Sequence, residues 1–285
     1  MAELTAKAYA KINLVLDIVG CRADGYHLVR MIMQTVGVAD ELEFTRTQDG
    51  QITIETNADL GKASDNLIYK AIDLIRKGKG IAGGMRVRLM KNIPVAAGLA
   101  GGSSDCAAAL KAMNELYGLG LSAEELAAYG VRLGADVPYC LMGGTAISEG
   151  IGEKLTPLPC APFAHVLLVK PPVGISTKEA YAAYDREVRH EHPDIDGLIR
   201  AIGEQDLHGM CACMGNVLEP VSIAMHPAIK AIKEKMLMLG AAGSMMSGSG
   251  PTVFGLFDNE DAAKKAYDEF RAALSDAEVF MTAFT

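Results

Sequence analysis

The chain has 285 residues, half of them hydrophobic, with no tryptophan and a formal net charge of −8 at pH 7. This length suits one large domain or two of ordinary size, and the net negative charge argues against extended nucleic-acid binding. An anionic ligand would therefore be bound by local lysines or backbone amides. No apolar run reaches the length of a membrane span, and the 6 cysteines include no C-x-x-C pair. Both features favour a reduced, cytoplasmic protein without a membrane segment.

Residues 6–18 alternate between apolar side chains and mostly polar ones. This period of two predicts a half-buried strand. Lys11 and Asn13 would project together from its polar face. The pattern alone leaves open whether that face is simply solvated or belongs to a binding site.

The segment Gly20–His27 is predicted to be a turn, because Asp24-Gly25 is typical of a hairpin. Further strands are expected over residues 28–45 and 51–56. Tyr26 and His27 offer a stacking ring and a ring that can donate and accept hydrogen bonds. They are either binding residues or an aromatic plug beside a surface histidine.

Ser64 is predicted to cap a helix that extends to Lys77, with apolar residues at helical spacing along one face. Asn66 lies in the first turn of this helix. It is either a helix-start residue or a side chain that reaches a ligand.

A loop rich in glycine, alanine and serine lies between a predicted strand (85–90) and a helix-forming segment (106–113). Ser103, Ser104 and Asp105 are all good N-caps, so the loop should lead into a helix N-terminus. Glycines let backbone N–H groups approach a ligand, and the helix end adds partial positive charge, which together suit a phosphate. Neither a Walker A sequence nor G-x-G-x-x-G is present, and a purely structural turn is the alternative. The loop comprises Pro94, Val95, Ala96, Ala97, Gly98, Leu99, Ala100, Gly101, Gly102, Ser103 and Ser104.

Ser122 and Glu125 are spaced as a capping box for a helix that ends near Gly134. Asp136 follows, two residues before Pro138. It is either the cap of a short helix or a catalytic carboxylate at the junction of two elements.

The proline-rich segment 156–162 is typical of a domain boundary, which divides the chain into residues 1–158 and 159–285. Beyond it we expect a strand at 164–170, a helix from about Lys178, and charged, weakly periodic helices over 186–215. A helix (226–239), two strands around a second glycine-rich turn, a helix (259–274) and a strand (278–284) complete the chain. This order predicts an antiparallel α+β sandwich of ferredoxin type.

Three separated segments, Ala8–Leu14, the 94–104 loop and Ser247–Thr252, resemble the three motifs of the GHMP kinases. This family is named for galactokinase, homoserine kinase, mevalonate kinase and phosphomevalonate kinase. The resemblance implies an α+β fold of two domains, the first like ribosomal protein S5 domain 2 and the second ferredoxin-like. Arg22–His27, Gly134–Pro138 and Pro171–Thr177 resemble the members that phosphorylate 4-diphosphocytidyl-2-C-methyl-D-erythritol.

The resemblance also implies roles in transfer of the γ-phosphoryl group of ATP to the substrate 2-hydroxyl. Asp136 would accept the hydroxyl proton, with Lys11 beside it to keep the carboxylate ionised and offset charge. Asn13 would orient the substrate, and Asn66 would contact the nucleotide. Residues 94–104 would surround the ATP phosphates, with Ser103 or Ser104 available to Mg²⁺ or a phosphate oxygen; the magnesium ligands themselves are not predicted.

The same resemblance places a cytosine ring between Tyr26 and Tyr181 and its edge against His27, with Tyr184 as the alternative to Tyr181. Ala96 and Ala97 stand where many relatives have glycines, which is tolerable if these positions do not need positive φ. The rival functions are another GHMP kinase of homoserine or mevalonate type, a non-catalytic nucleotide-binding protein and an RNA-binding protein. We expect a small-molecule enzyme that is a monomer or weak homodimer.

Overall fold

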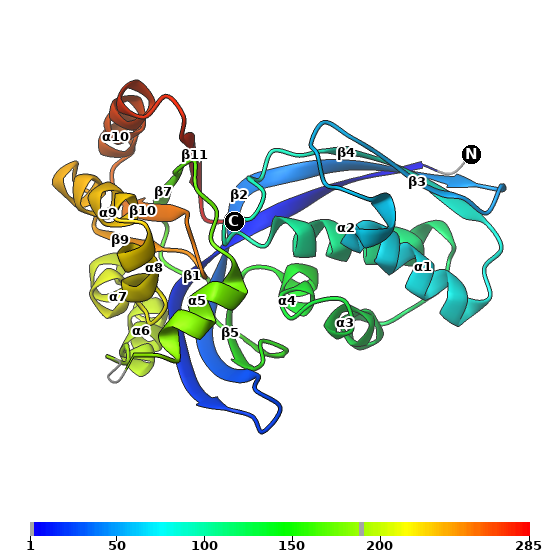
Figure 1. Ribbon diagram of the computed structural model, residues 1–285, viewed down its shortest axis with the longest axis horizontal. Helices are drawn as coiled ribbons and strands as arrows, with labels where there is room; N and C mark the ends of the chain where they lie inside the picture. The colour runs from blue at the N-terminus through cyan, green and yellow to red at the C-terminus, as the bar shows by residue number, and fades with distance from the viewer. Residues whose placement is uncertain (1–2, 188–190) are drawn as a thin grey trace. The chain divides into compact units, whose positions relative to one another are not determined.

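The computed structural model describes residues 3–187 and 191–285, which divide into two compact units (Figure 1). The first unit contains the residues up to Ala10, Val38–Val95 and Ala100–Gly143. The second contains Lys11–Gly37, Ala96–Leu99 and the residues from Gly144 onward. The long strands β1 (Glu3–Cys21) and β2 (His27–Thr47) contribute to both units, so each unit is discontinuous in sequence. The predicted boundary between residues 158 and 159 stays a prediction.

In the first unit, helices pack against a sheet whose inward side chains alternate along each strand. Strand β4 points Met85, Val87 and Leu89 into the core and Arg86 and Arg88 outward, as the period of two predicts. It pairs with β3 in parallel and with the end of β2 in antiparallel fashion. The other elements are β3 (Ile52–Thr56), β4 (Gly84–Met90), a 3₁₀ helix (Ala63–Asp65), α1 (Leu67–Lys79), α2 (Gly101–Leu116), α3 (Ala123–Val131) and α4 (Val137–Met142).

Two predicted helix starts are wrong. Residues 63–65 form the 3₁₀ turn, so the cap of α1 is Asn66, whose Oδ1 accepts a hydrogen bond from the N–H of Ile68 at 2.8 Å, and not Ser64. Helix α2 begins at Gly101, directly after Ala100 in the left-handed region. Ser103, Ser104 and Asp105 are therefore inside the helix and do not cap it. The capping box at Ser122 is confirmed.

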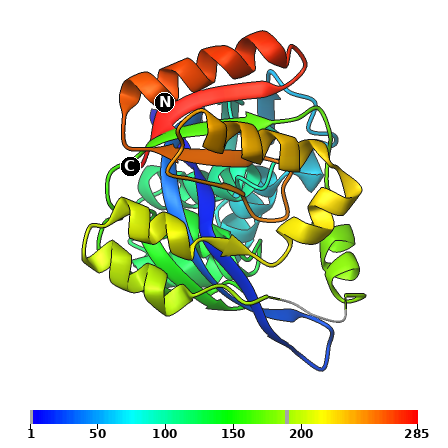
Figure 2. The same ribbon diagram turned by 90° about the vertical axis from the view of Figure 1, so that its left-hand side faces the viewer.

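The second unit contains a four-stranded antiparallel sheet in the order β11-β7-β10-β9. Its chain order, β7, helices, β9, β10, helix, β11, confirms the ferredoxin-type prediction. Helices α9 and α10 lie on one face of this sheet (Figures 1 and 2). The bounds are β7 (His165–Lys170), β9 (Gly243–Met246), β10 (Val253–Phe257), β11 (Glu278–Ala283), α9 (Ala228–Met238) and α10 (Glu260–Ala273).

The remaining elements of the second unit surround the carboxyl-terminal part of β1 and the first part of β2. Strand β8 pairs with β1 in parallel, and β5 links β2 to β6. Helix α6 buries Ile195, Leu198, Ala201 and Ile202, so the weak periodicity expected for this region is wrong. The bounds are β5 (Thr145–Gly150), β6 (Lys154–Pro157), β8 (Gly215–Asn216), α5 (Thr177–Tyr184), α6 (Ile195–Gly203), α7 (Leu207–Cys213) and α8 (Glu219–Met225).

Candidate functional site

Lys11 and Asn13 lie on β1 and are 5% and 0% exposed. The prediction of a half-buried strand holds for the first residues of β1 and is wrong from Ala10 to Ile18, where both faces are covered. A solvated face is therefore excluded for these two side chains. A buried ammonium group requires hydrogen-bond partners, and Lys11 Nζ donates to Asn13 Oδ1 at 2.6 Å and to the carbonyl oxygen of Gly98 at 3.4 Å.

The second glycine-rich turn meets the same carbonyl group. Ser247 Oγ donates to Gly98 O at 3.0 Å and accepts from the backbone N–H of Asn13 at 3.3 Å. The N–H of Lys11 donates to Leu99 O at 3.1 Å. Within the second unit, residues from all three motifs thus contact one another around Gly98.

Gly98 permits this convergence because of its missing side chain. Its φ of +77° lies in the left-handed region, and a Cβ at this position would collide with the carbonyl oxygen of Ser247. A methyl group would therefore separate the loop from the Ser247 turn. The close approach of two backbones explains why the motif needs glycine here.

Two alanines of the loop adopt the conformation that glycine favours. Ala96 has φ 52° and Ala100 has φ 56°, so the condition under which an alanine at position 96 is easily tolerated is not met. Ala97 is not among the residues with positive φ. An L-residue in this region costs about 1–2 kcal/mol, which the surrounding contacts must offset.

The end of the loop belongs to the first unit and forms the N-terminus of α2. The Ser104 hydroxyl donates to Tyr9 O at 2.8 Å. The Ser103 hydroxyl lies near Gly134, where an added Cβ would be 3.8 Å from Ser103 Oγ. The N-terminus of α2 and the segment that carries Asp136 are thus neighbours within this unit.

Asp136 occupies the N-cap position of α4, but its side chain makes no capping hydrogen bond. The interpretation of Asp136 as a simple helix cap is therefore wrong. Val137 is fully buried in the hydrophobic core with residues of α2, which fixes the backbone beside Asp136. Lys11 belongs to the other unit, so the pairing of Lys11 with Asp136 stays a prediction.

Asn66 uses its side-chain oxygen as the cap of α1. Both interpretations of this residue remain compatible, because the amide nitrogen is not part of the cap. A nucleotide contact through that nitrogen stays a prediction.

The aromatic residues expected to bind a base lie in the second unit. The ring of His27 is 4.7 Å from that of Tyr181 and 6.4 Å from that of Tyr184, the latter edge-on. Tyr184 is buried, whereas Tyr26 is 61% exposed, with the Arg22 guanidinium 5.9 Å from its ring centroid. His27 Nε2 lies 2.7 Å from Asp185 Oδ1. Tyr181 is the more open of the two alternatives, which favours it over Tyr184 as a stacking residue.

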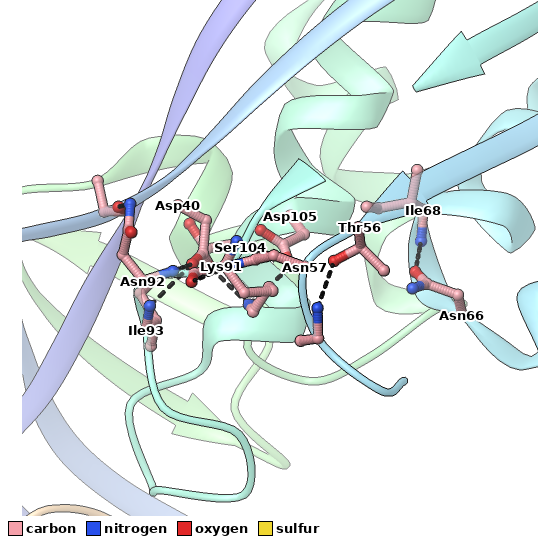
Figure 3. A network of polar contacts seen from close by, with 12 residues as sticks. Asp40, Thr56, Asn57, Asn66, Ile68, Lys91, Asn92, Ile93, Ser104 and Asp105 are labelled. Atoms are coloured by element: carbon pink, nitrogen blue, oxygen red, sulfur yellow. Dashed lines mark hydrogen bonds and ion pairs between the residues drawn. The ribbon is translucent and has the colours of Figure 1, made fainter. Parts of the chain in front are cut away.

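The first unit contains a buried ionic network that was not predicted from the sequence (Figure 3). Lys91 Nζ contacts Asp40 Oδ2 and lies 2.9 Å from Asp105 Oδ2. These side chains are 6%, 0% and 4% exposed, in the order Lys91, Asp40, Asp105. Burial, and then the neighbouring carboxylate of Asp40, raises the pKa of Asp105 to about 7, against the opposing effect of Lys91. In the described part of the chain Asp105 Oδ1 has no hydrogen-bond partner.

Strand alternation contained the signal that could have found this network. Lys91 continues the inward series of Met85, Val87 and Leu89. Asp40 precedes Leu42 and Phe44 on the inward face of β2. Because Glu41 pairs with Met90 in the antiparallel register, the next pair along is Asp40 and Lys91. Opposite charges at facing inward positions predict a buried ion pair.

Among the described residues, no helix is long and apolar enough to cross a membrane. The same part of the chain holds no group of three or more histidine, cysteine, aspartate or glutamate side chains placed to bind a metal ion.

Comparisons with known proteins agree over the whole chain. Residues 66–144 match the model of the GHMP kinases N terminal domain, and residues 198–276 match GHMP kinases C terminal. The 4-diphosphocytidyl-2-C-methyl-D-erythritol kinase of Lachnoclostridium phytofermentans is 50% identical over 100% of this chain and 98% of its own length. The enzyme of that name from Lachnospira eligens is 53% identical, covering 92% of this chain and 91% of its own. A crystal structure of 4-(cytidine 5'-diphospho)-2C-methyl-D-erythritol kinase superposes with a TM-score of 0.84 at 32% identity, over 99% of this chain and 100% of that one.

Proposed function

The chain belongs to the GHMP kinase family, and from this premise we propose that it phosphorylates the 2-hydroxyl of 4-diphosphocytidyl-2-C-methyl-D-erythritol with ATP. The observation that carries the proposal is the convergence of the three motifs on Gly98, in a chain similar from end to end to kinases of that name. The reaction is a step of non-mevalonate isoprenoid precursor synthesis. The rival homoserine and mevalonate kinases share the motifs but act on acceptors that carry no base.

Phosphoryl transfer needs alignment, charge neutralisation and a deprotonated acceptor more than covalent help from the protein. In our proposal, the backbone of residues 94–104 and the N-terminus of α2 bind the ATP phosphates. Lys11 offsets negative charge on the transferring group, Asn13 orients the substrate, and Asp136 accepts the hydroxyl proton. Asn66 contacts the nucleotide.

Mg²⁺ would neutralise the phosphate oxygens as the γ-phosphoryl group moves. A magnesium ion that shares ATP oxygens needs few protein ligands, which fits the serine hydroxyls at this helix N-terminus. Ser103 is favoured over Ser104, because Ser104 is buried whereas Ser103 is partly exposed.

The base of the substrate would stack on Tyr26 and Tyr181, with His27 at its edge. The contact of the His27 ring with Tyr181 and the exposure of Tyr26 support a binding surface here. We also propose that the enzyme is cytoplasmic, is a monomer or weak homodimer, and does not bind nucleic acid.

An ADP-release assay with magnesium and ATP tests this function by comparing 4-diphosphocytidyl-2-C-methyl-D-erythritol, homoserine and mevalonate. We expect turnover with the cytidyl acceptor alone. The Asp136→Asn variant should lose turnover by about 10²–10⁴-fold and keep most of its ATP affinity. Turnover with another acceptor would replace the proposed substrate. ATP binding without turnover of any acceptor would favour a non-catalytic nucleotide-binding protein.

A further inference from the structure

The buried network of Lys91, Asp40 and Asp105 lies at the two ends of the phosphate loop. Lys91 directly follows β4 and precedes the loop, whereas Asp105 follows Ser104 in α2. Asp40, from β2, accepts hydrogen bonds at Oδ1 from the N–H groups of Asn92 at 2.6 Å and Ile93 at 2.8 Å. The network therefore joins three elements of the first unit where the loop begins and ends (Figure 3).

At the start of the loop, hydrogen bonds hold the backbone of Lys91 and the side chain of Asn92. The Asn57 side chain accepts from Lys91 N at 2.8 Å and donates to Lys91 O at 3.2 Å. The Asn92 side chain donates to Ala39 O at 2.9 Å. Hydrogen bonds thus connect the residues just before Pro94 to two neighbouring segments of this unit.

The end of the loop, at Gly101, lies against the side chain of Lys91. A Cβ built on Gly101 would lie 3.1 Å from Lys91 Nζ and 3.0 Å from Ile93 Cγ2. The first turn of α2 is therefore in close contact with the Lys91 head group, which Asp105 also holds. A shift of either end of the loop would leave a buried charge uncompensated, which is costly. The hydrogen bonds of the network also have narrow distance and angle requirements, which apolar contacts lack.

We propose that Lys91, Asp40 and Asp105 are positioning residues that hold the two ends of the phosphate loop in register for ATP. This inference rests on the proposed function only in taking ATP as the ligand of the loop. The three side chains act through the backbone of the loop and do not themselves contact the phosphates.

The mildest test removes one charge without changing shape. Asp105→Asn keeps the size of the side chain and leaves the Lys91–Asp40 pair intact. At pH 8.5 we expect KM for ATP, and Kd for a non-hydrolysable ATP analogue by calorimetry, to rise on the order of tenfold. kcat and KM for the acceptor should stay within about twofold of wild type, because chemistry and acceptor binding use other residues.

Asp40→Asn is the second variant, since an asparagine oxygen can still accept from both backbone amides. Asp73→Asn is the matched control: it neutralises an aspartate of the same unit that pairs with Lys77 at 2.7 Å on the surface. We expect no change in the ATP constants for this control.

The separation of the kinetic constants is the readout that a purely structural role would not move. A general loss of packing would weaken activity towards both substrates, whereas the inference predicts a change confined to KM and Kd for ATP.

Unchanged ATP constants at pH 8.5 in both variants, with or without a lower melting temperature, would overturn the inference and leave the network merely structural. Wild type that binds the ATP analogue but phosphorylates no acceptor would refute the proposed function alone, and Kd would still decide the inference. Wild type that does not bind the analogue would overturn both.

Discussion

Each compact unit buries a lysine beside the phosphate loop, and the two lysines are held in different ways. Lys91 lies between two carboxylates of the first unit. Two hydrogen bonds of Lys11 within the second unit run to the neutral oxygens of Asn13 and Gly98. One lysine is part of a charge network beneath the ends of the loop, whereas the other contacts the backbone of the loop itself.

The difference separates positioning from chemistry. A cation between two carboxylates is needed for the folded state, because its loss leaves like charges together in a medium of low dielectric. A cation hydrogen-bonded to the phosphate loop lies where an anionic ligand would bring the opposite charge. The first should therefore be detected mainly in stability and the second mainly in turnover.

The largest effect is expected for Lys91→Met. The variant leaves Asp40 and Asp105 buried without a cation and should lose about 3–5 kcal/mol of unfolding free energy. Urea unfolding at pH 8, where Asp105 is mostly ionised, measures this loss. Lys77→Met, which removes a lysine 77% exposed in its side chain, is the control and should change stability by less than about 1 kcal/mol. Equal losses in the two variants would mean that the network contributes no more than a surface pair.

Lys11→Met should have the opposite effect, a large loss of turnover with a smaller loss of stability. We expect kcat/KM to fall about 10²–10³-fold, which is the cost of removing one preorganised group that stabilises transition-state charge. The loss of unfolding free energy should be smaller than for Lys91→Met. ADP release and urea unfolding on the same preparations give both numbers, with the exposed Lys7→Met on the same strand as control. A variant of Lys11 that is unstable but fully active when folded would contradict the assignment.

The contrast between the lysines also shows what sequence could predict. The glycine-rich composition between a predicted strand and a predicted helix located the loop, and the resemblance to the GHMP kinase motifs assigned Lys11 and Asn13 to the site. The ferredoxin-type order followed from element order alone. Alternation predicted strand β1 but not its burial, since the period of two is the same whether one face or both are covered.

Other features depend on tertiary contacts that local pattern does not encode. Asn66 and not Ser64 caps α1, because residues 63–65 first form a 3₁₀ turn. Ala96 takes a positive φ that its side chain disfavours, and the alanine itself does not predict this conformation. Alternation along β2 and β4 places both Asp40 and Lys91 on the inward face. Predicting their contact also requires the pairing register of the two strands.

Gly98→Ala should have an intermediate effect on stability. The substitution adds a methyl group at φ +77° and against the Ser247 carbonyl oxygen. Strain and overpacking together should cost about 2–3 kcal/mol. Urea unfolding measures the change. Gly118→Ala is the control, because Gly118 has φ +59° but a Cβ added there would meet open space. Similar losses at both glycines would attribute the effect to backbone conformation alone.

The stability of the Lys91 network should depend on pH in a defined direction. The pKa of Asp105 is raised by burial from its ordinary value of 3.8 to about 7, so the folded state binds an additional proton between these values. Stability from this group is fully present below pH 3.8 and is lost as the pH rises through about 7. Unfolding free energies of wild type relative to Asp105→Asn should thus fall between pH 5 and pH 8. A difference that is constant over this range would show that Asp105 does not titrate there.

The smallest effect is expected for Ala96→Gly, which tests the strain in the part of the loop that belongs to the second unit. Glycine adopts φ 52° without the steric cost that alanine meets. The gain is partly offset by the greater freedom of glycine in the unfolded chain, so stability should rise by at most about 1 kcal/mol. Ala97→Gly is the control, because Ala97 is not among the residues with positive φ and the variant should lose stability. An Ala96→Gly variant that is more stable but binds ATP more weakly would show that the strained alanine stiffens the loop for its ligand. The second unit would then contribute to positioning, as the Lys91 network does in the first unit.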